Sequence, residues 1–117
     1  MTPPASIVAS MMLLAALAAA APVGADELPG RAIAQDQEKG NCLACHRMPS
    51  DPGAETLANL GPALVDVKHL YPDRAALRAQ IWDASVKHPD TIMPPYGRHH
   101  ILTETEIDLV TDYIHGL

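Results

Sequence analysis

The chain contains one Cys-x-x-Cys-His sequence, and this motif constrains the fold more than any other feature. Cys42 and Cys45 are the only two cysteines of the 117 residues, and His46 follows directly. In a helical turn, side chains three residues apart project to the same side. Each thiol can therefore add to one vinyl group of a haem, which places the His46 imidazole under the iron. The spacing predicts one covalently bound haem c, with His46 as an axial ligand.

The composition favours a cofactor in the core. The chain has no Phe, one Trp and three Tyr, so it lacks the aromatic side chains that usually fill a small domain. A large, flat, apolar macrocycle can take their place. The length allows one domain.

The charge balance excludes one class of partner. Lys and Arg total 8 against 14 Asp and Glu, for a net charge of −6. Nucleic-acid binding needs a basic face to neutralise phosphates, and this chain does not supply one.

The N-terminus predicts export. Residues 7–21 carry no charge, but they are too few to cross a bilayer, which needs about 20 residues. The small residues that follow are typical of a cleavage site, so we expect a secretory signal peptide at 1–25 and a haem domain at 26–117 in the periplasm, without stable membrane insertion. No Lys or Arg precedes Arg31, so the usual positive segment is missing. An uncleaved signal anchor is the alternative.

Three other uses of the two cysteines compete with haem attachment. A thioredoxin-type dithiol requires a preceding strand, and the sequence before Cys42 has no strand pattern. A zinc site requires two histidines as well, but the compact His pair of structural zinc sites does not occur here. A plain disulfide between Cys42 and Cys45 is the third. The histidines available for zinc are His69, His88, His99 and His100.

The iron also needs a ligand opposite His46. Met48 lies two residues beyond His46 and cannot reach around the ring. Met93 lies in a loop stiffened by the two prolines that follow it, and its thioether would raise the reduction potential relative to a second imidazole. We therefore predict Met93 as the second axial ligand, with His99 and His100 as rivals. The remaining histidines, for which we expect surface positions, are His69, His88 and His115.

Three further residues are candidates for the surroundings of the haem. The 61–64 turn, which contains Pro62, could bring a carbonyl oxygen to the Nδ1–H of His46, or it could simply end a helix. Trp82 could donate its indole N–H to a haem propionate or fill core space. Arg98 could pair with a propionate or stay solvated.

The periodicity predicts an all-α fold of helices joined by long loops, without a sheet. We expect a first helix over 30–40, a short helical turn over 54–60, and a central helix that opens at Pro72 and stops before Pro89. Thr103 and Glu106 form a capping box that begins the last helix. The positions expected to be buried on the last two helices are Leu77, Ile81, Ala84, Ile107, Val110, Tyr113 and Ile114.

The sequence resembles class I c-type cytochromes, in which an N-terminal and a C-terminal helix pack around one haem. More narrowly, it resembles the SoxX family, the monohaem subunits of the bacterial thiosulfate-oxidising Sox system. The segments that carry the likeness are GNCLACHRMP at 40–49, NLGP at 59–62, LRAQIWDA at 77–84, MPPYGRH at 93–99 and ILT at 101–103.

This resemblance implies a set of partners. SoxX forms a heterodimer with the SoxA cytochrome, and the pair conjugates thiosulfate oxidatively to a cysteine of the carrier protein in the SoxYZ complex. Bond-making takes place on SoxA, whereas SoxX accepts the electrons and passes them to another small cytochrome. The chain would then be an electron-transfer subunit that is not catalytic alone. A freely diffusing monohaem cytochrome is the alternative.

Overall fold

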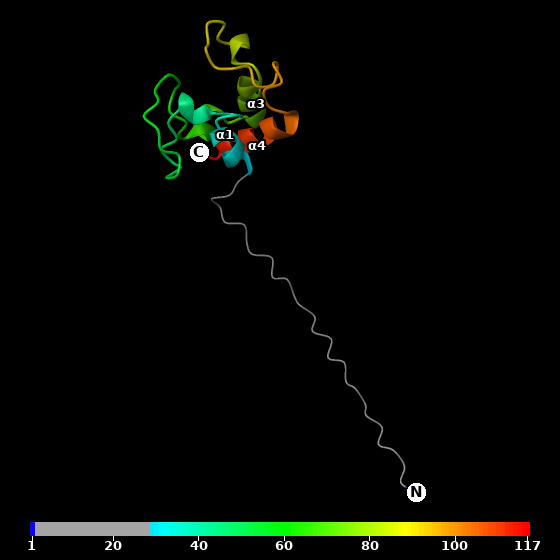
Figure 1. Cartoon of the computed structure of the whole chain (residues 1–117). Coiled ribbons are helices and arrows are strands. Elements are labelled where there is room, and N and C mark those ends of the chain that lie inside the picture. The colour runs from blue at the N-terminus through cyan, green and yellow to red at the C-terminus, as the bar shows by residue number, and fades with distance from the viewer. Residues whose placement is uncertain (2–28) are drawn as a thin grey trace.

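The computed structural model describes Met1 and residues 29–117, and residues 29–117 form helices and loops without a strand (Figure 1). The prediction of an all-α fold is confirmed. The signal peptide predicted at 1–25 lies, except for Met1, outside the described residues. No helix in the described part is long and apolar enough to span a membrane. The elements are α1 (Pro29–Gln35), η2 (Cys42–Ala44), α2 (Val67–Leu70), α3 (Arg74–Trp82), η3 (Ala84–Val86) and α4 (Glu104–His115).

Helix α4 is the element on which the other helices pack. Its N-terminus carries the predicted capping box: Glu106 N–H donates to Thr103 Oγ1 at 3.2 Å, and Thr103 N–H donates to Glu106 Oε2 at 3.0 Å. Such a cap contributes about 1 kcal/mol. The apolar face predicted from the helical periodicity is buried, so this prediction is confirmed. Its members are Ile107, Val110, Tyr113 and Ile114.

Helix α1 crosses α4 at close range, and the two lie side by side in Figure 1. The crossing depends on Gly30, because a Cβ there would lie 2.0 Å from the carbonyl oxygen of Leu109. Only a residue without a side chain allows the two backbones to approach this closely. The N-terminal and C-terminal helices of the described domain are thereby packed together, as expected.

Helix α1 ends at Gln35, whereas the sequence predicted a helix up to Gly40. The cause is Asp36, whose carboxylate accepts a hydrogen bond from the Glu38 N–H at 2.8 Å. This local bond offers the backbone an alternative to the helical ladder. The chain then turns, and Asn41 takes up a left-handed conformation (φ 47°) directly before the cysteine motif.

Helix α3 begins at Arg74, two residues after the predicted start at Pro72, because the Asp73 carboxylate caps it by accepting from the Ala75 N–H at 2.9 Å; it ends at Trp82, well before Pro89. It packs on α4. Ion pairs reinforce the contact: Arg74 Nε lies 2.5 Å from Asp112 Oδ1, and Arg78 Nε lies 2.6 Å from Asp108 Oδ1.

The prediction of a helical turn over 54–60 is wrong. Thr56 holds this segment open, because its hydroxyl donates to the Leu43 carbonyl at 3.0 Å and accepts from the Ala58 N–H at 3.1 Å. The single turn α2, anchored by the buried Val67, was not predicted. In both cases contacts with distant residues or with the core decide the conformation, and local pattern does not carry that information.

The segment after the cysteine motif is tied to both terminal helices through Asp51. Its carboxylate accepts from Arg31 at 2.6 and 3.1 Å, from Gln35 at 3.1 Å and from the Tyr113 hydroxyl at 2.6 Å. The hydrogen bond from Arg31 is the main reason that the pKa of Asp51 is lowered to about 2. Burial, assisted by the bond to Asp51, raises the pKa of Tyr113 to about 12.

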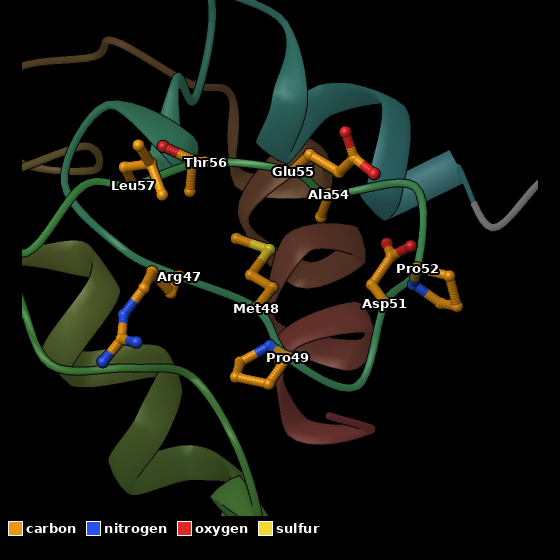
Figure 2. A pocket seen from close by; sticks show the side chains of 9 residues that line it. All are labelled: Arg47, Met48, Pro49, Asp51, Pro52, Ala54, Glu55, Thr56 and Leu57. Atoms are coloured by element: carbon orange, nitrogen blue, oxygen red, sulfur yellow. The ribbon is translucent and has the colours of Figure 1, made fainter.

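Residues of this segment, between positions 47 and 57, line an open surface groove (Figure 2). Met48 is one of the residues that line the groove, and its sulfur lies 3.3 Å from the hydroxyl oxygen of Tyr113 on α4. Its side chain is buried. Met48 therefore belongs to the core between the segment and α4.

Candidate functional site

A cavity of about 690 Å³ lies between the cysteine motif and the helices. This volume is within the range of small-molecule and cofactor sites. Its wall is mostly apolar, and core residues form the deep part of it. The deep residues include Val67, Leu77, Ile81, Val110 and Ile114.

Both cysteines line this cavity. Both cysteines are half-buried: Cys42 begins the η2 turn, Cys45 directly follows it, and the Cys45 N–H donates to the Cys42 carbonyl at 3.2 Å. Burial raises the pKa of Cys42 to about 11. Reactive cysteines of thiol oxidoreductases have lowered pKa values, and no strand precedes the motif in the described residues. The site therefore does not have the features of a redox dithiol.

His46 follows the turn and is held at its ring by the 61–62 segment. Its Nδ1 lies 2.6 Å from the Pro62 carbonyl oxygen, so Nδ1 carries the proton and donates it. A Cβ at Gly61 would lie 2.3 Å from His46 Cε1, so the ring fits against a position that only glycine allows. A backbone hydrogen bond joins the 61–62 segment to the cysteine motif: the Gly61 N–H donates to the Cys45 carbonyl at 2.9 Å. This arrangement leaves Nε2 with a free lone pair, which is the state that a metal ligand requires.

Met93 lines the same cavity. It lies on the loop of residues 87–103 between η3 and α4, which we call the methionine loop. Its N–H donates to Thr91 Oγ1 at 3.1 Å. After it, the buried Tyr96 reaches across to the cysteine side, where its hydroxyl donates to the Gly40 carbonyl at 2.5 Å. The end of the loop is fixed on α3 because the Gly97 N–H donates to the Trp82 carbonyl at 3.1 Å. The methionine loop is thus attached both to α3 and to the turn before the cysteines.

The histidines divide into two groups. His99 and His100 are exposed and are not among the residues that line the cavity, so the structure gives no support to them as ligands. His88 was expected on the surface; it is exposed, but it also lines the rim of the cavity. The described residues bring no three His, Cys, Asp or Glu side chains together in a way that could hold a metal ion, so the zinc alternative has no site.

Trp82 and Arg98 do not line the cavity. Arg98 is turned to Asp83 instead, with Nε 2.5 Å from Oδ2 of that buried carboxylate. The Trp82 ring packs against Gly97, where a Cβ would lie 2.0 Å from it, and the Arg78 guanidinium stacks on it at 5.5 Å from the centroid. The structure therefore places both side chains in the contact between α3 and the methionine loop. Their assignment to the haem surroundings stays a prediction.

Gln80 is a residue of the cavity wall that sequence reasoning missed. Its Oε1 atom is fully covered and has no hydrogen-bond partner. The signal was present in the periodicity, since Gln80 lies on the same helical face as Leu77 and Ile81. A polar residue within a buried apolar stripe indicates a role other than packing.

These residues fit a covalently attached haem. The wall combines two adjacent thiols, an imidazole with a free Nε2 and a thioether, which are donor types found in c-type haem sites. The glycine at position 61 makes room for the imidazole ring. The deep wall is apolar, as a macrocycle requires. Cys42, Cys45, His46 and Met93 would hold the group.

Two comparisons with known proteins show what this chain is similar to. A family model described as "Cytochrome c" matches residues 28–117. An uncharacterized lipoprotein of Aquifex aeolicus (strain VF5) is 32% identical over 78 residues. The match covers 67% of this chain and 37% of the Aquifex protein, so the chain spans well under half the length of this relative.

The fit at Gly61 generates a prediction. Gly61→Ala should force the His46 ring from its place, lower the free energy of unfolding of the haem-loaded protein by about 1–3 kcal/mol, and weaken its low-spin haem spectrum. Chemical denaturation and optical spectroscopy measure the two effects. Gly116→Ala is the matched control, because a Cβ there meets nothing closer than 3.3 Å. Equal behaviour of the two variants would contradict the proposed fit.

Proposed function

The chain belongs to the cytochrome c family, whose members bind haem c covalently and transfer electrons, and we propose that it carries one haem as the electron-transfer subunit of a larger cytochrome. The observation that carries the haem site is one cavity lined by Cys42, Cys45, His46 and Met93. The bound group would supply a one-electron couple between ferric and ferrous iron. An external reduced partner provides the electron and a second partner takes it up, so no bond in the chain forms or breaks.

The protein's part in this proposal is to hold the iron ligands in fixed positions. The hydrogen bond from His46 Nδ1 to the Pro62 carbonyl fixes the tautomer and the plane of the ring, and it raises the basicity of Nε2. The Tyr96 bond to Gly40 and the Gly97 bond to α3 restrict the loop that bears Met93. Little rearrangement is then needed when the iron changes its charge.

We further propose that the protein is exported, with a signal peptide at 1–25 and the haem domain at 26–117 in the periplasm. The apolar N-terminal sequence supports export. The name of the Aquifex relative, a lipoprotein, agrees with it. Haem attachment to Cys-x-x-Cys-His motifs in bacteria takes place outside the cytoplasm, which is consistent with this location.

The finer proposal is a SoxX-like role beside a SoxA-type cytochrome, a SoxYZ-type carrier and a small cytochrome acceptor. The sequence segments described above support it. A permanent partner also requires an apolar surface. Exposed apolar side chains at the rim of the cavity supply one: Leu60 (68% exposed), Leu70 (65%) and Ile92 (73%). Both cysteines are assigned to haem attachment, so the chain offers no thiol for thiosulfate chemistry.

The methionine assignment is tested with two single variants. Met93→Ala should abolish the weak red charge-transfer band that is typical of thioether-ligated ferric haem, and it should lower the reduction potential. Met48→Leu is the control, because Met48 is buried against Tyr113 outside the cavity wall. This variant should keep the band. A band that survives in Met93→Ala would contradict the assignment.

The partnership is tested by co-purification from the native host. We expect an affinity tag on this chain to recover a second c-type cytochrome in stoichiometric amount under mild conditions. Leu70→Glu at the exposed rim should reduce that recovery at least tenfold, since a charge on an apolar interface is costly to desolvate. Recovery of this chain alone would instead support a freely diffusing electron shuttle.

A further inference from the structure

Gln80 is the feature of the cavity that haem attachment alone does not explain. It lies in the last turn of α3, next to Ile81 and one turn after Leu77, both of which are buried in the cavity wall. Among the described residues, Gln80 Oε1 is the one fully covered side-chain nitrogen or oxygen without a hydrogen-bond partner. Gln80 thus places a polar group with an unpartnered oxygen between buried apolar residues.

An unsatisfied buried oxygen destabilises the folded protein, and a leucine would avoid that loss. The presence of an amide at position 80 is therefore explained only if its NH₂ group has a function. The carboxamide nitrogen carries two N–H donors, and no hydrogen bond of the described residues uses them. Since only the oxygen is fully covered by protein, the NH₂ end is the part of this side chain that can face the cavity.

Two neighbouring hydroxyl groups of the wall already have hydrogen-bond partners. The Thr91 hydroxyl accepts from the Met93 N–H, and the Tyr96 hydroxyl donates to the Gly40 carbonyl. Gln37, which has the same side chain as Gln80, lies on the exposed rim of the cavity, where water competes for its hydrogen bonds.

We propose that Gln80 tunes the reduction potential of the bound haem by presenting the N–H end of its carboxamide to the haem cavity. This inference rests on the haem function proposed above. The iron centre gains one negative charge on reduction, and the N–H end is the positive end of the amide dipole. In an apolar cavity such a dipole is weakly screened. Gln80 therefore stabilises the ferrous state and raises the potential.

The experiment is an optical redox titration of the haem-loaded protein and its variants. Gln80→Leu removes the dipole and should shift the midpoint potential downward. Gln80→Glu keeps the length of the side chain but replaces the N–H donors by a carboxylate, so the downward shift should be larger. Gln37→Leu is the matched control, and its potential should equal that of the wild type because Gln37 is exposed.

The outcomes separate this inference from the haem function. Absence of covalent haem from the wild-type protein would end the proposed function itself. A Gln80→Leu variant that holds haem with a low-spin spectrum but has an unchanged or higher potential would overturn only the role of Gln80. If Gln80→Leu does not fold, the Gln80→Met variant, which has a similar length but neither N–H donors nor a charge, decides: a lower potential supports the role, and an unchanged or higher one overturns it.

Discussion

The structure depends on one constraint, which is that this chain builds its core around a cavity and not around large side chains of its own. Protein interiors rarely leave room for more than a water molecule, yet the cavity here measures about 690 Å³ and its deep wall consists of core residues. A chain without Phe has few means of closing such a space. A covalently bound macrocycle satisfies the constraint, because it provides apolar surface that the sequence does not contain.

Three contacts bring the chemistry-bearing residues to this cavity. The close approach of α1 to α4 at Gly30 fixes the position of α1, from which the chain leads into the cysteine turn. The Pro62 carbonyl and the missing side chain of Gly61 fix the His46 ring. The Tyr96 hydroxyl joins the methionine loop to the backbone just before the cysteines. These links connect segments far apart in sequence, and together they turn separate motifs into one site.

Much of this arrangement could be predicted from the sequence. The capping box at Thr103 and the buried face of α4 are local patterns with a direct physical cause, and the structure has them. The cysteine motif and Met93, recognised by residue type and spacing, line one cavity. Local patterns are reliable where a few neighbouring residues decide the conformation.

The errors arose where side-chain hydrogen bonds, local or distant, decide the structure. The Asp36 carboxylate ends α1 early by accepting a hydrogen bond from the Glu38 N–H. The Thr56 hydroxyl prevents the predicted helical turn by donating to the Leu43 carbonyl. For Arg98 the sequence shows the charge but not the partner that the structure places beside it, which is Asp83; the pairing with a propionate stays a prediction. Gln80 was overlooked for a related reason: its importance depends on which atoms surround it.

The central claim is that Cys42 and Cys45 hold a haem covalently, and the most direct test is the mass of the intact protein isolated from its native host under denaturing conditions. The account predicts a mass equal to the polypeptide plus one haem, with no thiol left for alkylation. A bare polypeptide whose two cysteines react with an alkylating reagent would contradict it.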